Sequence, residues 1–276
     1  MARPQDRQSM NRTFPLFANA APLRAVLLRE FRDALINRYF QVFSVLSLLG
    51  GAAAFVLSED AHSIAFLILQ VSLYFVSLFA LLAGVSSAQA EREEWQMLFA
   101  QPVPRFAYVI GKFIAYLAIF GAVLLLLFLP GFMAGAGGQK IAMLYVQTLL
   151  LAAAFLALGL AAGFFAHDRA QALIAGVSAW LLLLFGIDLI ALFAARWELI
   201  QKFPDLWLSL LMLNPLDSFR IEALFALEQI PAEAANKTPL ASWWITHAAL
   251  WFSVIAAFWS TTLVAFAGLR LNRWEE

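Results

Sequence analysis

The sequence predicts an all-α integral membrane protein with six transmembrane helices. The 276-residue chain is 63% hydrophobic and 13% charged, whereas soluble domains have about 45–50% apolar and about 25% charged residues. A water-soluble fold of this length cannot hide so much apolar surface. Six apolar runs approach or exceed the length of about 20 residues that a helix needs to cross a hydrocarbon core of about 30 Å. The solvent of this protein is therefore mostly lipid.

Two elements are expected before the first apolar run. Residues 1–20 are polar and predict a flexible cytoplasmic tail, ahead of one membrane domain over residues 21–276. Apolar residues then recur at every fourth position with charged residues between them: Leu23, Leu27, Phe31 and Leu35, with Arg24, Arg29, Arg32 and Asp33. This pattern predicts an amphipathic helix at the membrane surface. A basic flank that only sets the topology is an alternative, and the two are compatible.

The six spans are expected at residues 39–57, 63–85, 113–134, 141–165, 172–195 and 246–268. An even number of spans puts both termini on one side, and the distribution of Lys and Arg indicates which side. If the N-terminus is inside, thirteen basic residues lie in inner segments and five in outer segments. The outer five are Lys140, Arg196, Lys202, Arg220 and Lys237. Both termini are therefore expected in the cytoplasm, and the long segment between spans five and six on the outer side.

A charged segment, EREEWQMLFAQPVPR at residues 91–105, connects the second and third spans on the expected cytoplasmic side. Read as a helix, Trp95, Leu98 and Phe99 share one face at positions i, i+3 and i+4, while Glu91, Arg92 and Glu94 remain in water. Pro102 and Pro104 end the helix. A helix of this kind is suited to binding a soluble partner, and an inert interfacial loop is the alternative.

The same segment resembles the permeases of type-2 ABC exporters. Their pattern of acidic residues, an apolar stretch, Pro-Val/Leu-x-Arg and Gly-Lys at the mouth of the third span corresponds to Glu91, Glu93 and Glu94, then Pro102-Val103-Pro104-Arg105, then Gly111-Lys112. The resemblance implies that this segment, with its helix at residues 91–101, is a cytoplasmic coupling helix seated in a cleft of a separate ATPase. The coupling residues are then Glu91, Arg92, Glu93, Glu94, Trp95, Leu98, Phe99, Pro102 and Arg105. The chain departs from the family at Glu93-Glu94, where Gly-Thr is usual.

A second stretch lies at the outer end of the chain. Asp188 falls within the fifth span, and LNPLDSFR follows at residues 213–220. This combination is similar to the membrane subunits of the copper-delivery transporters that mature nitrous oxide reductase. The residues that carry the similarity are expected to form a gate or a structured outer helical hairpin: Asp188, Asn214, Pro215, Asp217, Phe219 and Arg220.

The residues of this stretch also have simpler structural roles. Asn214 followed by Pro215 is typical of a helix start, and Asp217 and Arg220 can pair at i, i+3. A carboxylate within a span is costly unless it is protonated or paired. Asp188 is therefore expected to anchor the outer segment, with Arg220 as its candidate partner, or to lie at the water boundary.

Motifs for catalysis or for a cofactor are missing from the sequence. Gly111-Lys112 does not complete a phosphate-binding loop, because the pattern needs Gly at position 106 and Ser or Thr at position 113, and both hold Phe. No H-E-x-x-H occurs, and the chain has no cysteine. His62, Met133, Met212 and His247 come from four separate segments. Trp251 and Trp259 are read as packing residues of the membrane interface. We expect no enzyme activity, metal or cofactor in this chain, and ATP with Mg²⁺ in the partner.

The resemblance gives the expected function. Two copies of the chain pair in the bacterial cytoplasmic (inner) membrane, and a separate ABC ATPase drives export or mechanical action on a periplasmic accessory protein, in the maturation of a multicopper enzyme. The alternatives are an exporter of lipid, peptide or drug and a membrane anchor or assembly scaffold without transport. The balance of 18 basic and 18 acidic residues gives no indication of nucleic-acid binding.

Overall fold

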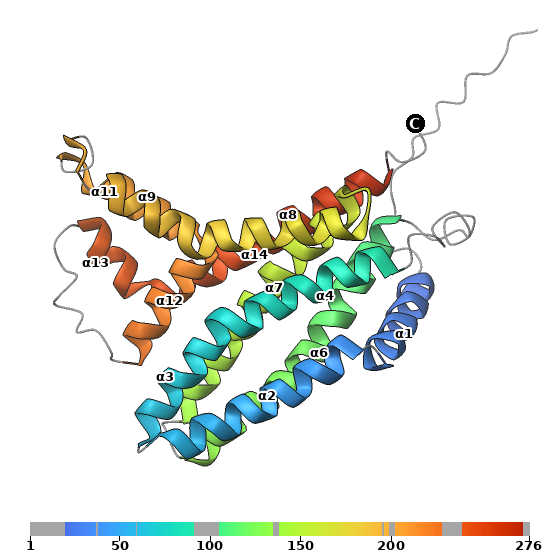
Figure 1. Cartoon of the computed structure of the whole chain (residues 1–276), viewed down its shortest axis with the longest axis horizontal. Coiled ribbons are helices and arrows are strands. Elements are labelled where there is room, and N and C mark those ends of the chain that lie inside the picture. Colours follow the sequence, from blue (N-terminus) through green and yellow to red (C-terminus); the bar gives the residue numbers. More distant parts are fainter. Residues whose placement is uncertain are drawn as a thin grey trace, which may run out of the picture.

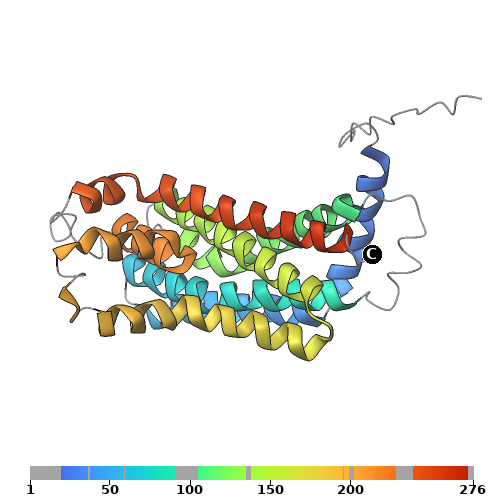
Figure 2. The same cartoon turned by 90° about the horizontal axis from the view of Figure 1, so that it is seen from above.

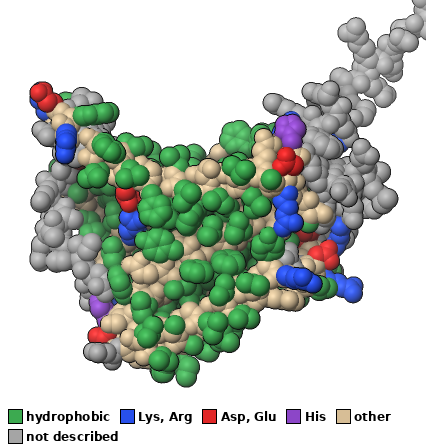
Figure 3. Space-filling model, viewed as in Figure 1, with side chains coloured by type: hydrophobic (Ala, Val, Ile, Leu, Met, Phe, Trp, Pro, Cys, Tyr) green, Lys and Arg blue, Asp and Glu red, His purple; other side chains and the backbone are tan. Residues whose placement is uncertain are grey.

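The computed structural model describes residues 20–36, 38–58, 60–90, 105–134, 138–194, 196–198, 202–227 and 239–272. These ranges are helical, without a strand among them, and they contain six helices long and apolar enough to cross a membrane. The fold class expected from the sequence is thereby confirmed. Hydrophobic side chains cover the middle of the surface in Figure 3, and the charged side chains lie toward its margins.

Each span is longer than the range expected from hydropathy, although the sixth begins at Ala248 rather than at residue 246. They are α2 (Arg38–Leu57), then α3 (Ala61–Val71), η1 (Ser72–Val76) and α4 (Ser77–Ala90) as the second, α6 (Arg105–Met133), α7 (Gly138–Phe165), then α8 (Arg169–Leu181), η3 (Leu182–Gly186) and α9 (Ile187–Ala194) as the fifth, and α14 (Ala248–Asn272). The largest difference is in the third span, because α6 begins at Arg105 rather than Phe113. Polar residues such as Lys112 therefore belong to this helix.

The remaining described helices lie at the two ends of the bundle. α1 (Ala20–Ile36) runs across one end of the long helices rather than along them (Figure 2). α11 (Pro204–Leu213), α12 (Pro215–Ala226) and α13 (Pro239–Thr246) lie at the opposite end (Figure 1). A helical hairpin is thus present between spans five and six. The position of α1 relative to a membrane surface stays a prediction.

The centre of the bundle is formed by α7, which packs against α4 on one side and α14 on the other. α4 and α7 approach closely through glycines. A Cβ on Gly84 would lie 2.5 Å from the carbonyl oxygen of Leu156, and a Cβ on Gly159 would collide with the carbonyl of Leu81. Small residues of this kind let helix backbones meet in a membrane, where apolar burial alone does not favour helix association.

Two π-helical turns, η1 and η3, interrupt the second and fifth spans. Trp180, next to η3, donates its indole N–H to Ser77 Oγ at 2.9 Å, and Ser77 follows η1 directly. The two turns are therefore at similar depth, and both contact α12. A π turn disturbs the regular carbonyl pairing of a helix, and such turns often occur at functional sites. The hairpin of α11 and α12 rests on these two π turns, and it is called the outer hairpin below after the side expected from the sequence.

Candidate functional site

The outer hairpin is joined to the fifth span by Asn214. Its side chain caps α12 by accepting a hydrogen bond from Leu216 N at 3.1 Å, with Pro215 in the first turn as the sequence predicts. Its amide Nδ2 donates to the carbonyl of Leu183 in η3 at 2.7 Å and also to Asp217. One buried amide therefore starts α12 and ties it to a π turn. Phe219 continues the buried face of α12 and packs on Phe252 of α14, with ring centroids 5.5 Å apart.

Arg220 brings two carboxylates together beside this cap. Its Nη1 lies 3.3 Å from Asp188 Oδ2 and 3.5 Å from Asp217 Oδ1, so both pairs considered from the sequence are present. Asp188 lies in the first turn of α9 and its side chain is 46% exposed, whereas that of Asp217 is 4% exposed. Burial raises the pKa of Asp217 to about 6, against the opposing charge of Arg220. Asp188 therefore sits near the end of its span, and Asp217 is the buried acid.

A third outer carboxylate, Glu222, was not singled out from the sequence. Glu222 is 2% exposed, and its Oε2 has no hydrogen-bond partner within the described part of the chain. Burial raises its pKa to about 7. Phe219 of α12 contacts Phe252 of α14, and the two helices run in opposite directions. Three residues further along α12 therefore correspond to three residues back along α14, which puts Glu222 at about the level of Ala249. Gln147 of α7 donates to the Ala249 carbonyl at 3.5 Å, which places this polar group at the same level.

At the other end of the bundle, a buried ion pair holds α1 on α6. Lys112 Nζ lies 2.7 Å from Glu30 Oε2, and both side chains are 1% exposed. The rings of Tyr108 and Tyr116 flank the ammonium group at 5.2 and 5.9 Å. The sequence places Lys112 only at the mouth of the expected third span, so it gave no sign that this lysine would be buried. It gave no indication that the partner would be Glu30.

Most of the expected coupling residues lie outside the described residues. These are Glu91, Arg92, Glu93, Glu94, Trp95, Leu98, Phe99 and Pro102, and nothing follows here about their conformation. Both flanks of the segment are described and are tied to neighbouring spans. Gln89 Nε2 donates to the Gly163 carbonyl of α7 at 2.6 Å, and Arg105 Nη1 donates to the Leu271 carbonyl of α14 at 2.7 Å. The chain therefore leaves and re-enters the bundle at the end that carries α1 (Figure 1).

The helix α14 contacts both of these regions. Leu271, near its last turn, accepts from Arg105. Near the first turn Trp251 donates to the Met212 carbonyl at 2.9 Å, and near the middle Trp259 donates to the Leu213 carbonyl at 3.1 Å. These indoles bind the last carbonyls of α11, a contact that the sequence did not predict. One helix thus connects the flank of the coupling segment with the outer hairpin.

A comparison with family models matches residues 70–272 to the ABC-2 family transporter protein. The match begins within the second span and ends with α14, so it includes the charged segment and the outer hairpin. The chain belongs to the ABC-2 transporter family. It is a permease subunit of an ABC exporter, embedded in the membrane, and the family implies a separate ATPase subunit. A search of curated proteins found no match.

Proposed function

We propose that this ABC-2 permease is one half of a transporter in which two copies pair and each binds one ATPase through residues 91–105. The support comes from the flanks of this segment, because Gln89 and Arg105 are each hydrogen-bonded to another span. A push on the segment is therefore delivered to α7 and α14 rather than absorbed by a free loop. Glu91, Glu93 and Glu94 give the segment an acidic side that suits a basic groove on the ATPase.

The observation that carries the proposal is the position of α14. It accepts a hydrogen bond from Arg105 near its last turn and donates two to the α11–α12 junction, from Trp251 near its first turn and from Trp259 near its middle. A helix transmits a displacement along its axis because each turn is hydrogen-bonded to the next. ATP-driven movement of the coupling segment then shifts the outer hairpin. In this movement the hydrogen bond from Asn214 to the Leu183 carbonyl of η3 breaks and forms again. Movement of this contact is the gating step of the proposed cycle.

We further propose that the output is mechanical action on an extracytoplasmic accessory protein in the maturation of a multicopper enzyme. The similarity to copper-delivery transporters involves Asp188, Asn214, Asp217 and Arg220, and these side chains form one connected cluster. The expected copper chemistry belongs to the accessory proteins and not to this chain. Export of an apolar cargo is the second candidate, favoured by the apolar interior of the described bundle.

The proposal is tested by purifying the tagged permease with its associated ATPase and measuring ATP hydrolysis with and without the permease. An ATPase that co-purifies and whose hydrolysis changes when the permease is present is the expected result. A permease that retains no ATPase, or one without effect on hydrolysis, would favour the reading of a membrane anchor or scaffold. Addition of the outer partner or of lipid-like cargo to the coupled complex then separates the two candidate outputs.

A further inference from the structure

The seam between α2 and the second span contains two hollows, one apolar and one polar. The apolar hollow is lined by positions 43, 46, 47, 49, 50 and 53 of α2 and by positions 71, 75 and 76 of the facing helix. The polar hollow is lined by position 57 of α2, by positions 58 and 60 of the loop and by positions 62, 63, 66 and 67 of α3. Most of these positions lie three or four residues from another position of the same helix, so each helix contributes one stripe to the seam. The two hollows therefore follow one another along a single seam, with the polar one at the loop between the helices.

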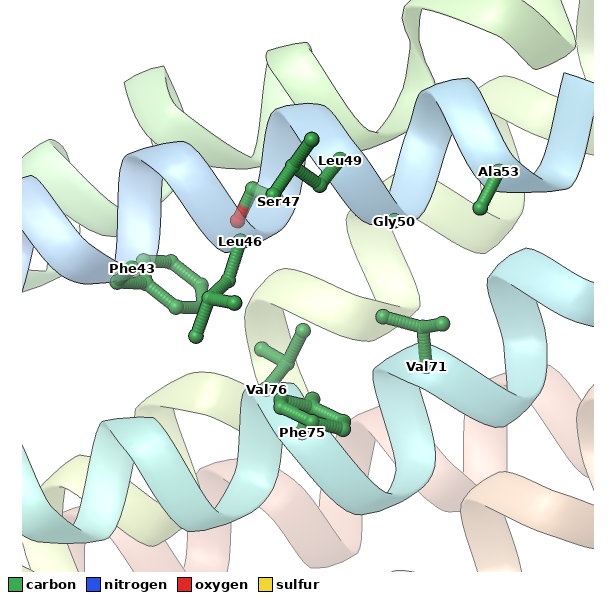
Figure 4. A pocket seen from close by; sticks show the side chains of 9 residues that line it. All are labelled: Phe43, Leu46, Ser47, Leu49, Gly50, Ala53, Val71, Phe75 and Val76. Carbon is green, nitrogen blue, oxygen red and sulfur yellow. The ribbon is translucent and has the colours of Figure 1, made fainter.

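The apolar hollow is a groove with a volume of about 270 Å³. Phe43, Leu46 and Ala53 of α2 line it on one side, and Val71 and Phe75 line it on the other, as Figure 4 shows. A Cβ on Gly50 would only reach ordinary contact with Leu127 and Val71, at 3.5 and 3.7 Å. The absence of a side chain at position 50 therefore contributes space to the groove. Ser47 is the one polar residue of the lining.

The depth of the groove excludes water as its filling. Val71 ends α3, which is 11 residues long, and so lies about 15 Å from the loop end of the helix at 1.5 Å per residue. That distance is half of a hydrocarbon core about 30 Å thick. A single hydrocarbon chain fits the size, the depth and the apolar lining.

The polar hollow lies where the headgroup of the same molecule would be. Its lining includes Ser58, Asp60, His62 and Ser63. Hydrogen bonds from the Ser63 side chain and backbone lower the pKa of Asp60, so its carboxylate is ionised at neutral pH. Ser58 Oγ is shielded from solvent and has no hydrogen-bond partner within the described ranges. A carboxylate beside hydroxyl and imidazole groups favours a headgroup that carries an ammonium group and disfavours an anionic one.

We propose that one bilayer phospholipid with a primary-amine headgroup, of the phosphatidylethanolamine type, binds along the α2–α3 seam. Its acyl chain fills the groove between Gly50, Ala53 and Val71, and its ammonium group pairs with Asp60. The site borders η1, which also contacts the outer helix α12. The bound lipid therefore supports the π turn on which the outer hairpin rests. This binding requires neither the ATPase nor the proposed transport cycle, so it is tested separately from them.

The test is native mass spectrometry of the delipidated permease in detergent, titrated with phosphatidylethanolamine, phosphatidylcholine or phosphatidylglycerol of equal chain length. Ala53 and Ala52 are neighbouring exposed residues of α2, but only Ala53 lines the groove. Ala53→Leu fills the groove and is expected to weaken lipid binding about tenfold or more, whereas Ala52→Leu leaves it unchanged. Asp60→Asn keeps the helix cap and removes the preference for phosphatidylethanolamine over phosphatidylcholine.

Equal lipid binding by Ala53→Leu and Ala52→Leu would overturn the groove assignment. Equal binding of the three lipids by the unaltered protein would overturn the headgroup assignment. A second measurement avoids dependence on the fold of the variants: a phosphatidylethanolamine with a photoreactive acyl chain is crosslinked to the unaltered protein. Crosslinks are expected within residues 43–53 and 71–76, and crosslinks confined to other segments would overturn the proposal. Loss of self-association in Ala53→Leu, with lipid binding intact, would assign the groove to a second copy instead.

Discussion

Asn214 illustrates how far single residues of the outer site follow from the sequence. Its capping role was predictable, because Asn before Pro is a local signal for a helix start. Its bond to the Leu183 carbonyl was not predictable, since the π turn η3 lies in a uniformly apolar run without a distinctive pattern. The pairing of Asp188 with Arg220 was considered because each charge needs a partner. Glu222 was missed, since its burial depends on helices distant in sequence.

Asp188 gives the first prediction at this scale. Asp188→Ala removes one of the two carboxylates that hold Arg220, and we expect normal insertion but lower coupled ATPase activity or outer-partner function. Expression level and ATPase activity of the assembled complex are the measurements. Glu198→Ala, which removes an acid that is 86% exposed, serves as the control. Full activity of Asp188→Ala at normal expression would leave the residue with a structural role only.

Glu222 gives a pH dependence. Its pKa rises from 4.5 to about 7 in the fold, so the folded state binds more protons than the unfolded state between these values. The contribution of Glu222 to stability is therefore present below about pH 4.5 and is lost as pH rises through about 7. The loss is on the order of 3 kcal/mol. As pH rises from about 4.5 to about 7, the melting temperature in detergent should fall less steeply for Glu222→Gln than for the unaltered protein. Identical slopes for the two proteins would contradict the raised pKa of Glu222.

At the scale of elements, the helices were predictable where lipid alone determines them. All six spans were found from the length of apolar runs, and their ends differ by up to eight residues because hydropathy does not detect polar residues that are buried by neighbours. Arg105 to Lys112 form the start of α6 for this reason, since Lys112 is buried against Glu30. The periodicity of the N-terminal segment predicted a helix, but its docking on α6 depends on a pair separated by 82 residues.

The docking of α1 gives a third prediction. Lys112→Met leaves Glu30 buried without this ammonium group, and removal of one partner of a buried pair costs about 3–5 kcal/mol. Glu30→Gln combined with Lys112→Met should recover part of that loss, because the uncompensated charge is gone. Lys202→Met, at an exposed pair, should stay within about 0.5 kcal/mol. Thermal unfolding in detergent measures all three, and a double variant no more stable than Lys112→Met would contradict this account of the pair.

At the scale of the whole molecule, the two ends of the bundle have different roles in the proposal. α1 and the flanks of residues 91–105 share one end, and the outer hairpin occupies the other (Figure 1). The sequence predicted this division from the positions of the spans. The orientation in the membrane rests on the thirteen-to-five distribution of basic residues. The role of α14 as a link was not predictable, because the Leu271 carbonyl accepts from the distant Arg105, and Trp251 and Trp259 donate to distant backbone carbonyls.

The orientation is the fourth prediction. Because the chain has no cysteine, single cysteines report accessibility without background labelling. In intact cells an impermeant thiol reagent should not label Glu93→Cys and should label Glu198→Cys, which lies at the opposite end. Labelling of Glu93→Cys in intact cells would invert the topology and remove the basis for binding a cytoplasmic ATPase.

The central claim is that residues 91–105 bind the ATPase, and its most direct test is reversal of their charge. Glu91→Lys combined with Glu94→Lys should weaken association with a basic ATPase surface without unfolding the permease, because these acids contribute mainly to encounter and orientation. Trp95→Ala should remove an aromatic anchor, at a cost of about 2 kcal/mol or more, and uncouple hydrolysis from output. Glu198→Lys is the matched control at the outer end.

The measurement is the amount of ATPase retained per permease in detergent, together with the hydrolysis that the permease stimulates. The account predicts less retained ATPase for the charge-reversed permease, reduced coupling for Trp95→Ala and no change for Glu198→Lys. Equal retention and equal stimulated hydrolysis in all variants would contradict it, and residues 91–105 would then be an ordinary interfacial loop.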